Sequence, residues 1–439
     1  MQSGAIAHPS TQLSGIITAP GDKSISHRAI ILGALANGQT EVTGLLRGAD
    51  ILSTIGAMTS LGAKIAENED GSWTVDGCGD KGLNSPDDIV DCGNAGTGVR
   101  LIMGAAAAYR ITAKFTGDES LRSRPMARVL DPLRDMGASV KSAKGDRLPL
   151  TIASNGELSP VDYTPPHASA QVKSAILLAG LKSEGVTTVR EKRLTRDHTE
   201  NMLRAFGAEV KTRAKDDGQI VSIEGPIALH GTRVNVPGDP SSAAFAIVAA
   251  LIVPGSSIHI ENVMMNPTRT GLFETLAEMG ADIRTDNFRK SGGEVIADLH
   301  VRHSNLRGVT VPPQRAPSMI DEYPILAVAA AFAKGDTVMN GIDELRVKES
   351  DRISATVELL RRNGVDVTES ADGMRVRGGA VTGGAKVKSF HDHRIAMSAL
   401  ILGLAAQNPV EIDDASMIAT SFPDFFDLMA SLGANIETS

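Results

Sequence analysis

Two kinds of apolar stretch alternate along the chain. In the first kind, apolar residues stand three and four positions apart, as in residues 51–60 and 353–362, which predicts helices with one buried face. The second kind consists almost wholly of Ala, Ile, Leu and Val, as in residues 29–36 and 245–252. It predicts helices that are buried on every side. Short β-rich runs such as 257–262 predict strands between the helices.

A glycine followed by Ala or Val, any residue and an apolar residue closes each amphipathic stretch. The six copies lie 69 to 84 residues apart, at Gly62, Gly137, Gly207, Gly280, Gly364 and Gly433. Each glycine stands where a helix ends in a left-handed residue, and the next positions alternate as in a strand. A common helix-to-strand joint is the alternative explanation, but the even spacing favours six internal repeats. One repeat reads strand, Ala-rich helix, strand, amphipathic helix, strand, strand.

A second repeated motif indicates that the chain consists of two similar halves. PGDKS at 20–24 returns as PGDPSS at 237–242, each time before an Ala-rich helix, with Pro240 where the first copy has Lys23. The sequence therefore predicts an α/β protein with two domains of three repeats each. The Ala-rich helices should lie in the middle of each domain, with sheets and amphipathic helices outside.

Composition narrows the function. The 439 residues carry a net charge of -8 and only 3% aromatic residues, which argues against polyanion binding and against base stacking. Cys78 and Cys92 are too few for a disulfide framework or a zinc site and fit a reducing cytoplasm. The N-terminus lacks the features of a signal peptide, and the apolar run around 243–253 is too short to span a bilayer. Any anion must bind at a locally basic site.

Polar residues gather where the buried helices begin. Helix N-termini attract phosphate and carboxylate groups. Cations stand at these starts or in the loops before the amphipathic helices, at Lys23, Arg28, Arg100, Arg122, Arg124, Arg196, Lys348, Arg352 and Arg394. Each alone could be a solvated surface charge, but their equivalent positions favour an anion site. Asp321 and Glu349 stand among them and could carry a proton, or only neutralise their neighbours. The histidines at helix starts have no zinc-site spacing, so no metal is expected.

These motifs together resemble one family. PGDKSISHR, GNAGTGVR, SRPM, SAQVKSA, TRDHTE, PGDPSSAAF, SMIDEYP, RVKESDR and DHRIAM occur in the order found in the 5-enolpyruvylshikimate-3-phosphate (EPSP) synthases. The resemblance covers nearly the whole chain. It implies a two-domain inside-out α/β barrel of six βαβαββ repeats, three per domain, with the active site in the cleft between the domains. Domain 1 would comprise 1–19 and 241–439, and domain 2 would comprise 20–240.

The resemblance also implies an activity and its residues. The family transfers the enolpyruvyl group of phosphoenolpyruvate to the 5-hydroxyl of shikimate 3-phosphate, without metal or organic cofactor. The residues implied for shikimate 3-phosphate are Lys23, Ser24, Arg28, Ser169, Ala170, Gln171, Arg196, Asp321 and Lys348. Those implied for phosphoenolpyruvate are Lys23, Gly96, Arg124, Gln171, Arg352 and Arg394. Asp321 would take the proton of the 5-hydroxyl, Glu349 would transfer protons at the methylene, and Lys23 would touch both substrates.

Two positions depart from patterns in this family. Thr420 stands where many members have a lysine, which puts that substrate contact in doubt. Gly96 stands where glyphosate-tolerant members of the divergent bacterial branch have Ala, so we expect glyphosate to bind to this protein. We also expect the protein to be a monomer. The enolpyruvyl transferase that acts on UDP-N-acetylglucosamine remains a rival, although its catalytic cysteine has no counterpart here. A binding protein for phosphorylated acids, without turnover, is the second rival.

Overall fold

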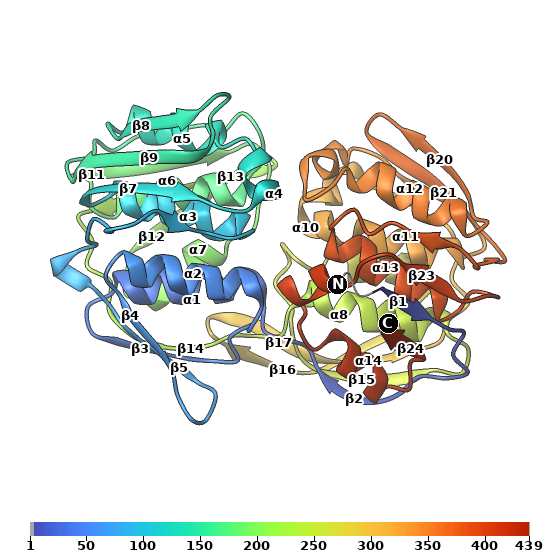
Figure 1. Cartoon of the computed structure of the whole chain (residues 1–439). Coiled ribbons are helices and arrows are strands. Elements are labelled where there is room, and N and C mark those ends of the chain that lie inside the picture. Colours follow the sequence, from blue (N-terminus) through green and yellow to red (C-terminus); the bar gives the residue numbers. More distant parts are fainter. Residues whose placement is uncertain (1–3, 439) are drawn as a thin grey trace. The chain divides into compact units, whose positions relative to one another are not determined.

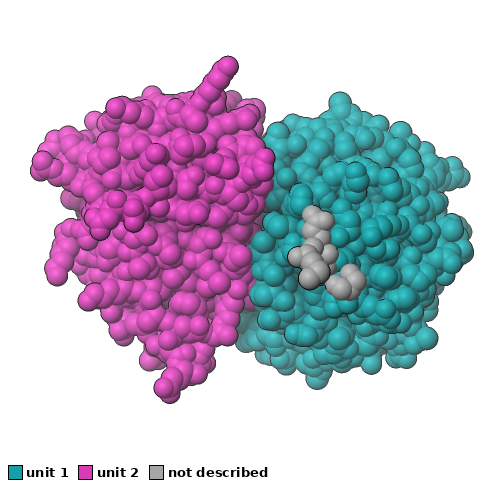
Figure 2. Space-filling model, viewed as in Figure 1, with its two compact units in different colours: residues 1–20, 237–290, 295–439 teal, residues 21–236, 291–294 magenta. Residues whose placement is uncertain are grey.

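A computed structural model describes residues 4–438, which form two compact units (Figure 2). Of these residues, unit 1 comprises 4–20, Pro237–Lys290 and 295–438. Unit 2 comprises Gly21–Val236 together with the four residues Ser291–Glu294. The boundaries that the family resemblance implies lie one residue earlier than the observed boundary at 20/21 and four residues later than the observed boundary at 236/237. The sequence contains no sign that residues 291–294 belong to unit 2.

Six four-stranded sheets share one topology. In each, a short edge strand runs parallel to the second strand, as β10 does to β11. The second and third strands are antiparallel, as in β11 and β13, and β13 in turn pairs with β12 in the same sense. A parallel pair needs a crossover, which an Ala-rich helix supplies in four of these sheets, as α6 does between β10 and β11; in the other two, the edge strands β2 and β14 come from distant parts of the chain. The predicted repeat is confirmed, and the sheets of residues 4–438 remain separate, without closing into a barrel.

Unit 2 holds three of these repeats (Figure 1, blue to green). Its helices are α1 (Lys23–Leu35), α2 (Ala49–Ser60), α3 (Gly96–Ala107), α4 (Glu119–Ser123), α5 (Ala127–Asp135), α6 (Ala170–Gly180) and α7 (His198–Ala205), with a 3-10 turn at Gly79–Lys81. Its strands are β3 (Gln39–Thr43), β4 (Lys64–Glu67), β5 (Trp73–Asp76), β6 (Val90–Asp91), β7 (Arg110–Thr116), β8 (Ser139–Ala143), β9 (Arg147–Asn155), β10 (Asp162–Tyr163), β11 (Gly185–Glu191), β12 (Val210–Lys215), β13 (Gly218–Gly225) and β14 (Arg233–Asn235).

Unit 1 holds the other three repeats. Its helices are α8 (Pro240–Ile252), α9 (Gly271–Glu278), α10 (Ala316–Met319), α11 (Tyr323–Ala331), α12 (Arg352–Arg362), α13 (His393–Gly403) and α14 (Phe425–Ser431), with 3-10 turns at Pro313–Arg315, Ile320–Glu322, Asp343–Val347 and Ser416–Thr420. Its strands are β1 (Ala5–Ala7), β2 (Ser14–Thr18), β15 (Ser257–Met264), β16 (Asp282–Ser291), β17 (Glu294–Arg302), β18 (Thr310–Val311), β19 (Gly335–Met339), β20 (Asp366–Ser370), β21 (Gly373–Gly378), β22 (Lys386–Val387), β23 (Val410–Ile412) and β24 (Ile436–Thr438).

The Ala-rich helices form the core of each unit, as predicted. In unit 1, α8, α11 and α13 pack against one another, and every residue of α8 is buried. In unit 2, α3 packs against both α1 and α6. The α3–α6 approach requires glycine, because a Cβ at Gly104 would lie 2.3 Å from the carbonyl oxygen of Ala175. Small side chains thus let the helix backbones come close together.

The repeated glycines end their helices in the left-handed conformation, which confirms the prediction. Their φ angles run from 83° to 110°, at Gly62, Gly137, Gly207, Gly280, Gly364 and Gly433. Helix α9 begins at Gly271, after a turn in which the side chain of Asn266 accepts a hydrogen bond from Thr268 N. Helix α2 begins at Ala49, so Asp50 lies inside its first turn.

The N-terminal strands belong to sheets that the rest of the chain builds much later. Strand β2 directly precedes α1 in sequence, yet it is the edge strand beside β15 in unit 1. The edge position in the first sheet of unit 2 is taken by β14, which runs parallel to β3. Strand β1 lies between β23 and β24 (Figure 1, blue between red strands). None of the described helices has both the length and the hydropathy that crossing a membrane would require.

Candidate active site

The start of α1 brings three predicted site residues together in unit 2. Asp22 caps the helix by accepting a hydrogen bond from Ile25 N at 2.7 Å, which fixes where Lys23 and Ser24 lie. Lys23 forms an ion pair with the buried Asp50. The Arg28 guanidinium is buried and donates to Ser24 O, to the Ser174 hydroxyl and to the Thr199 hydroxyl, at 3.0, 2.9 and 2.7 Å. Arg28 therefore joins α1 to α6 and α7.

The starts of α3 and α6 meet through Gln171. Its amide oxygen accepts from Arg100 Nη1 at 2.9 Å, and its amide nitrogen donates to Thr97 Oγ1 at 2.8 Å. Arg124 lies over the same helix start, because a Cβ on Gly96 would be 2.7 Å from Arg124 Nη1. The Ser169 hydroxyl caps α6 by accepting from Val172 N, which places Ala170 in the first helical turn. Helix N-termini and cations thus converge in this unit, as an anion site requires.

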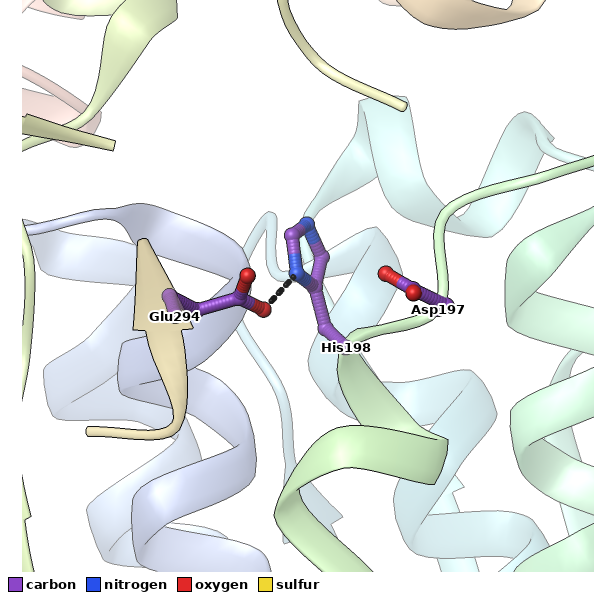
Figure 3. A group of neighbouring side chains, drawn as sticks. All are labelled: Asp197, His198 and Glu294. Carbon is purple, nitrogen blue, oxygen red and sulfur yellow. Dashed lines mark hydrogen bonds and ion pairs between the residues drawn. The ribbon is translucent and has the colours of Figure 1, made fainter. Parts of the chain in front are cut away.

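Arg196 lies in the loop that leads into α7 and is half-buried. The two residues after it, Asp197 and His198, form a group with Glu294 (Figure 3). His198 Nδ1 and Glu294 Oε1 are 2.9 Å apart, and Figure 3 shows the two carboxylates on opposite sides of the imidazole. One ligand atom from each residue lies within 4.8 Å of the others, a spacing that a metal ion could use. However, the positive end of α7 and the adjacent Arg196 disfavour a cation there.

We expect that removal of divalent metal ions leaves any catalytic activity of this site unchanged. The phosphate and carboxylate groups expected at these helix starts can be matched by side-chain cations, so no metal is needed to neutralise them. Extended dialysis against EDTA should change the turnover rate by less than about twofold, within the scatter of such comparisons. Loss of activity that Mg²⁺, Mn²⁺ or Zn²⁺ restores would contradict this and would point to the Asp197, His198 and Glu294 group.

Arg352 is the centre of the corresponding cluster in unit 1. The side chain is almost completely buried, and three carboxylates surround its guanidinium. Nε donates to Asp392 Oδ2 at 2.8 Å, Nη1 to Asp321 Oδ1 at 3.1 Å and Nη2 to Glu349 Oε2 at 2.5 Å. These ion pairs raise the pKa of Arg352 although burial opposes them. Two candidate proton carriers, Asp321 and Glu349, are therefore held by one arginine.

Two further cations complete this cluster. Arg394 Nη1 donates to the backbone oxygen of Asp321 at 3.1 Å, and Arg394 N donates to Asp392 Oδ1 at 2.9 Å. Burial lowers the pKa of Lys348, and the nearby charge of Asp321 acts in the opposite direction. Burial also works against ionisation of Asp392, but the charge of Arg352 holds its pKa below the usual value. Arg394 Nη1 also lies 3.6 Å from Glu322 Oε1, and Lys348 Nζ lies 3.9 Å from Glu344 Oε1, so every cation of this cluster has an acid beside it.

The PGDPSS echo has a cation that sequence reasoning missed. Asp239 caps α8 by accepting from Ser241 N at 2.8 Å, just as Asp22 caps α1. Arg269 Nη2 donates to Asp239 Oδ1 at 2.9 Å and to Ser241 Oγ at 2.8 Å, and the Ser241 hydroxyl bonds to Glu322. The charge absent at Pro240 is therefore supplied from another segment. Asp392 was also missed, although an acid directly before a buried helix is the signal of a cap.

Three other residues, Cys92, His27 and Thr420, add neither a nucleophile nor a positive charge to the site. Cys92 is buried, and burial raises the pKa of its thiol to about 12, so it is a poor nucleophile. Burial, together with the charges of Lys23 and Arg28, lowers the pKa of His27 well below its ordinary value. His27 is therefore neutral near pH 7 and adds no charge to the site. The Thr420 hydroxyl donates to Met417 O at 2.6 Å, a contact within its own turn.

Sequence comparison identifies the family. Residues 7–429 match the family model described as EPSP synthase (3-phosphoshikimate 1-carboxyvinyltransferase). This chain is a member of the EPSP synthase family. A 3-phosphoshikimate 1-carboxyvinyltransferase of Chelativorans sp. (strain BNC1) is 58% identical over 438 residues, which is 99% of this chain and 97% of that protein. The one from Caulobacter vibrioides (strain NA1000 / CB15N) is 58% identical over 440 residues, 99% of either chain.

The fold agrees with that of solved EPSP synthases. A 2.37 Å structure of the enzyme from Acinetobacter baumannii matches with a TM-score of 0.89 and 44% identity, covering 100% of both chains. The predicted two-part α/β architecture of an EPSP synthase is therefore confirmed. Within unit 2, the implied residues lie in the first two turns of α1 (Lys23, Ser24 and Arg28), at the starts of α3 (Gly96) and α6 (Ser169, Ala170 and Gln171), and in the segments before α5 (Arg124) and α7 (Arg196). Within unit 1 it gathers Asp321, Lys348, Glu349, Arg352 and Arg394.

Proposed function

We propose that this protein transfers the enolpyruvyl group of phosphoenolpyruvate to the 5-hydroxyl of shikimate 3-phosphate. The products are 5-enolpyruvylshikimate 3-phosphate and phosphate, as a step in aromatic amino acid biosynthesis. The observation that carries the proposal is membership of the EPSP synthase family over residues 7–429. The convergence of cations and helix N-termini in both units supports it, because both substrates are multiply charged anions.

The negative charge of the two substrates explains why the candidate site contains many lysine and arginine side chains. Each substrate carries a phosphate and a carboxylate, so the pair brings roughly five negative charges near neutral pH. Two such anions repel each other strongly at close range, and opposing side-chain charge must offset that repulsion. We assign the phosphate of shikimate 3-phosphate to Ser169, Ala170, Gln171 and Arg196, and its ring end to Asp321 and Lys348. Lys23, Ser24 and Arg28 complete this set.

For phosphoenolpyruvate we assign Lys23, Gly96, Arg124, Gln171, Arg352 and Arg394. The implied residues come from both units, and we propose that the units act on the substrates together. Attack at C2 of phosphoenolpyruvate requires protonation of C3, for which Glu349 is the candidate acid. Asp321 is the candidate base for the 5-hydroxyl. Addition of the 5-oxygen to C2 and of a proton to C3 gives a tetrahedral adduct, and loss of phosphate together with a proton from the C3 methyl group gives the enol ether. Exclusion of water during this step prevents hydrolysis of phosphoenolpyruvate.

A two-substrate assay tests the proposal. Phosphate release should require shikimate 3-phosphate and phosphoenolpyruvate together, and either substrate alone should give only background. Release with UDP-N-acetylglucosamine in place of shikimate 3-phosphate would identify the rival transferase, whose cysteine chemistry the buried Cys92 does not provide. Binding of both substrates without phosphate release would indicate a binding protein.

We further propose that glyphosate binds in place of phosphoenolpyruvate and that the active species is a monomer. Glyphosate carries a phosphonate and a carboxylate, so the same arginines can hold it. Its secondary amine makes it longer than phosphoenolpyruvate, and Gly96 has no side chain at a position where a methyl group would lie 2.7 Å from Arg124 Nη1. Sedimentation of the active protein at its sequence mass of 45.9 kDa would support the monomer, whereas twice that mass would contradict it.

A further inference from the structure

A buried ion cluster in unit 2 lies outside the residues assigned to the reaction. Lys173 of α6 is completely buried and pairs with two acids. Its Nζ lies 2.9 Å from Glu191 Oε2 and 2.7 Å from Glu200 Oε1, and both carboxylates are themselves buried. Gln219 donates to Glu191 Oε2 at 2.9 Å. Three ionisable groups without access to water are costly to bury, so their arrangement calls for a reason beyond stability.

The side chains of this ion cluster contact the loop of residues 192–197 at three places: just before it begins, in its middle and just after it ends. Residues 192–197 connect β11 to α7, and Glu191 is the last residue of β11. The hydroxyl of Thr195, in the middle of the loop, donates to Glu191 Oε1. Glu200 lies in the first turn of α7, just after the loop, and bonds to Lys173. Thr195 directly precedes Arg196, so its hydrogen bond limits where the arginine backbone can lie.

The same two helices are joined a second time. Ser174 and Thr199 share a hydrogen bond of 2.6 Å, and each accepts a hydrogen bond from Arg28. Residues 173 and 174 of α6 thus hold residues 199 and 200 of α7. Lys173 lies about one turn after Ser169, the first residue of the segment Ser169–Gln171 to which we assign the substrate phosphate. The loop carrying Arg196 is therefore tied to the helix that begins with that segment.

We propose that Lys173, Glu191, Glu200 and Thr195 are positioning residues that hold Arg196 in register with Ser169–Gln171 for the phosphate of shikimate 3-phosphate. They touch no substrate and act through Arg196. A preformed pair of phosphate-binding segments loses little conformational freedom when the ligand binds, so its affinity is higher. The proposal rests on the proposed function and adds to it the device by which the phosphate is recognised.

Thr195→Val tests the proposal, because it removes the hydroxyl and keeps the shape. The KM for shikimate 3-phosphate should rise about tenfold, while kcat and the KM for phosphoenolpyruvate change by less than about threefold. Thr195→Ser should restore the wild-type KM. Thr187→Val is the matched control, since Thr187 lies on β11 and its buried hydroxyl has no partner among residues 4–438. If Thr195→Val does not fold, Glu200→Gln replaces it in the test. This variant keeps the shape of the side chain but removes its charge, and it should raise the KM for shikimate 3-phosphate in the same way.

A double-mutant cycle separates positioning from general loosening. In an Arg196→Ala background, Thr195→Val should raise the KM for shikimate 3-phosphate by less than about twofold, because its route of action is already gone. Full additivity of the two changes would overturn the proposal, as would an equal rise in both substrate KM values. If the wild type releases no phosphate, the proposed function fails; if it does and Thr195→Val matches it, only this inference fails.

Discussion

Asp321→Asn should reduce kcat by about 10²- to 10⁴-fold, the range that a positioned general base contributes. The amide keeps the size of the side chain and can still accept from Arg352 Nη1, which lies 3.1 Å from Asp321 Oδ1. The backbone oxygen that accepts from Arg394 is unchanged. The variant therefore loses the ability to take a proton while the cations around it stay in place. Steady-state phosphate release gives kcat, and equilibrium binding gives the affinity for shikimate 3-phosphate.

The affinity of Asp321→Asn for shikimate 3-phosphate should fall by no more than about threefold. Replacing the acceptor of a single hydrogen bond changes the net binding free energy only slightly. Asp336→Asn is the matched control, an exposed acid of the same unit that pairs with Arg375 at 2.8 Å. It should leave kcat and affinity unchanged. A kcat for Asp321→Asn within tenfold of the wild type would remove Asp321 from the role of base. Asp321→Ala should be as inactive as Asp321→Asn and bind somewhat more weakly.

Gly96→Ala should separate the inhibitor from the substrate. The added Cβ would lie 2.7 Å from Arg124 Nη1 and 3.3 Å from Arg100 Nη1, so the ends of two flexible side chains must move. The longer glyphosate has less room to adjust than phosphoenolpyruvate. Overpacking a filled site costs about 1–3 kcal/mol, which corresponds to a rise of roughly 5- to 140-fold in the glyphosate inhibition constant. The KM for phosphoenolpyruvate should rise by less than about fivefold, because the smaller ligand can shift.

Gly56→Ala is the matched control, since Gly56 lies in α2 of the same unit and an added Cβ there meets nothing within 4 Å. Both constants should stay at the wild-type values in that variant. The inhibition constant is measured by competition against phosphoenolpyruvate at saturating shikimate 3-phosphate. Failure of sub-millimolar glyphosate to compete with phosphoenolpyruvate in the wild type would contradict the proposed binding mode. An equal rise in both constants would show that Gly96 does not discriminate between the ligands.

The repeat could be predicted because its signal is local. A left-handed glycine after an amphipathic helix is fixed by a few neighbouring residues, and all six positions behave alike. The burial of the Ala-rich helices follows equally from composition, because a helix without a polar face has no side to expose. The gathering of cations at helix starts within each unit also followed from equivalent positions in the repeat.

Partnerships between distant residues could not be predicted in this way. Nothing local indicates that Arg269 replaces the missing charge at Pro240 or that Arg352 has Asp321, Glu349 and Asp392 around it. These contacts depend on side-chain geometry across helices that are far apart in sequence. The same holds for Lys173, which sequence reasoning included only as part of the SAQVKSA motif. A lysine in an apolar helix is the one signal that could have pointed to a buried acid partner.

The position of β1 and β2 has a consequence for the order in which the chain folds. Gly21–Val236 is continuous, so nearly all of unit 2 is complete once the first half of the chain has been synthesised. Strand β2 must wait for β15, and β1 must wait for β23 and β24, which lie at the end of the chain. Contacts this distant in sequence form late because the entropy of closing the intervening loop must be overcome first. Pairing of β1 with β23 and β24 therefore completes the last sheet of unit 1, and a ribosome-bound nascent chain should contain a folded unit 2 while unit 1 is still incomplete.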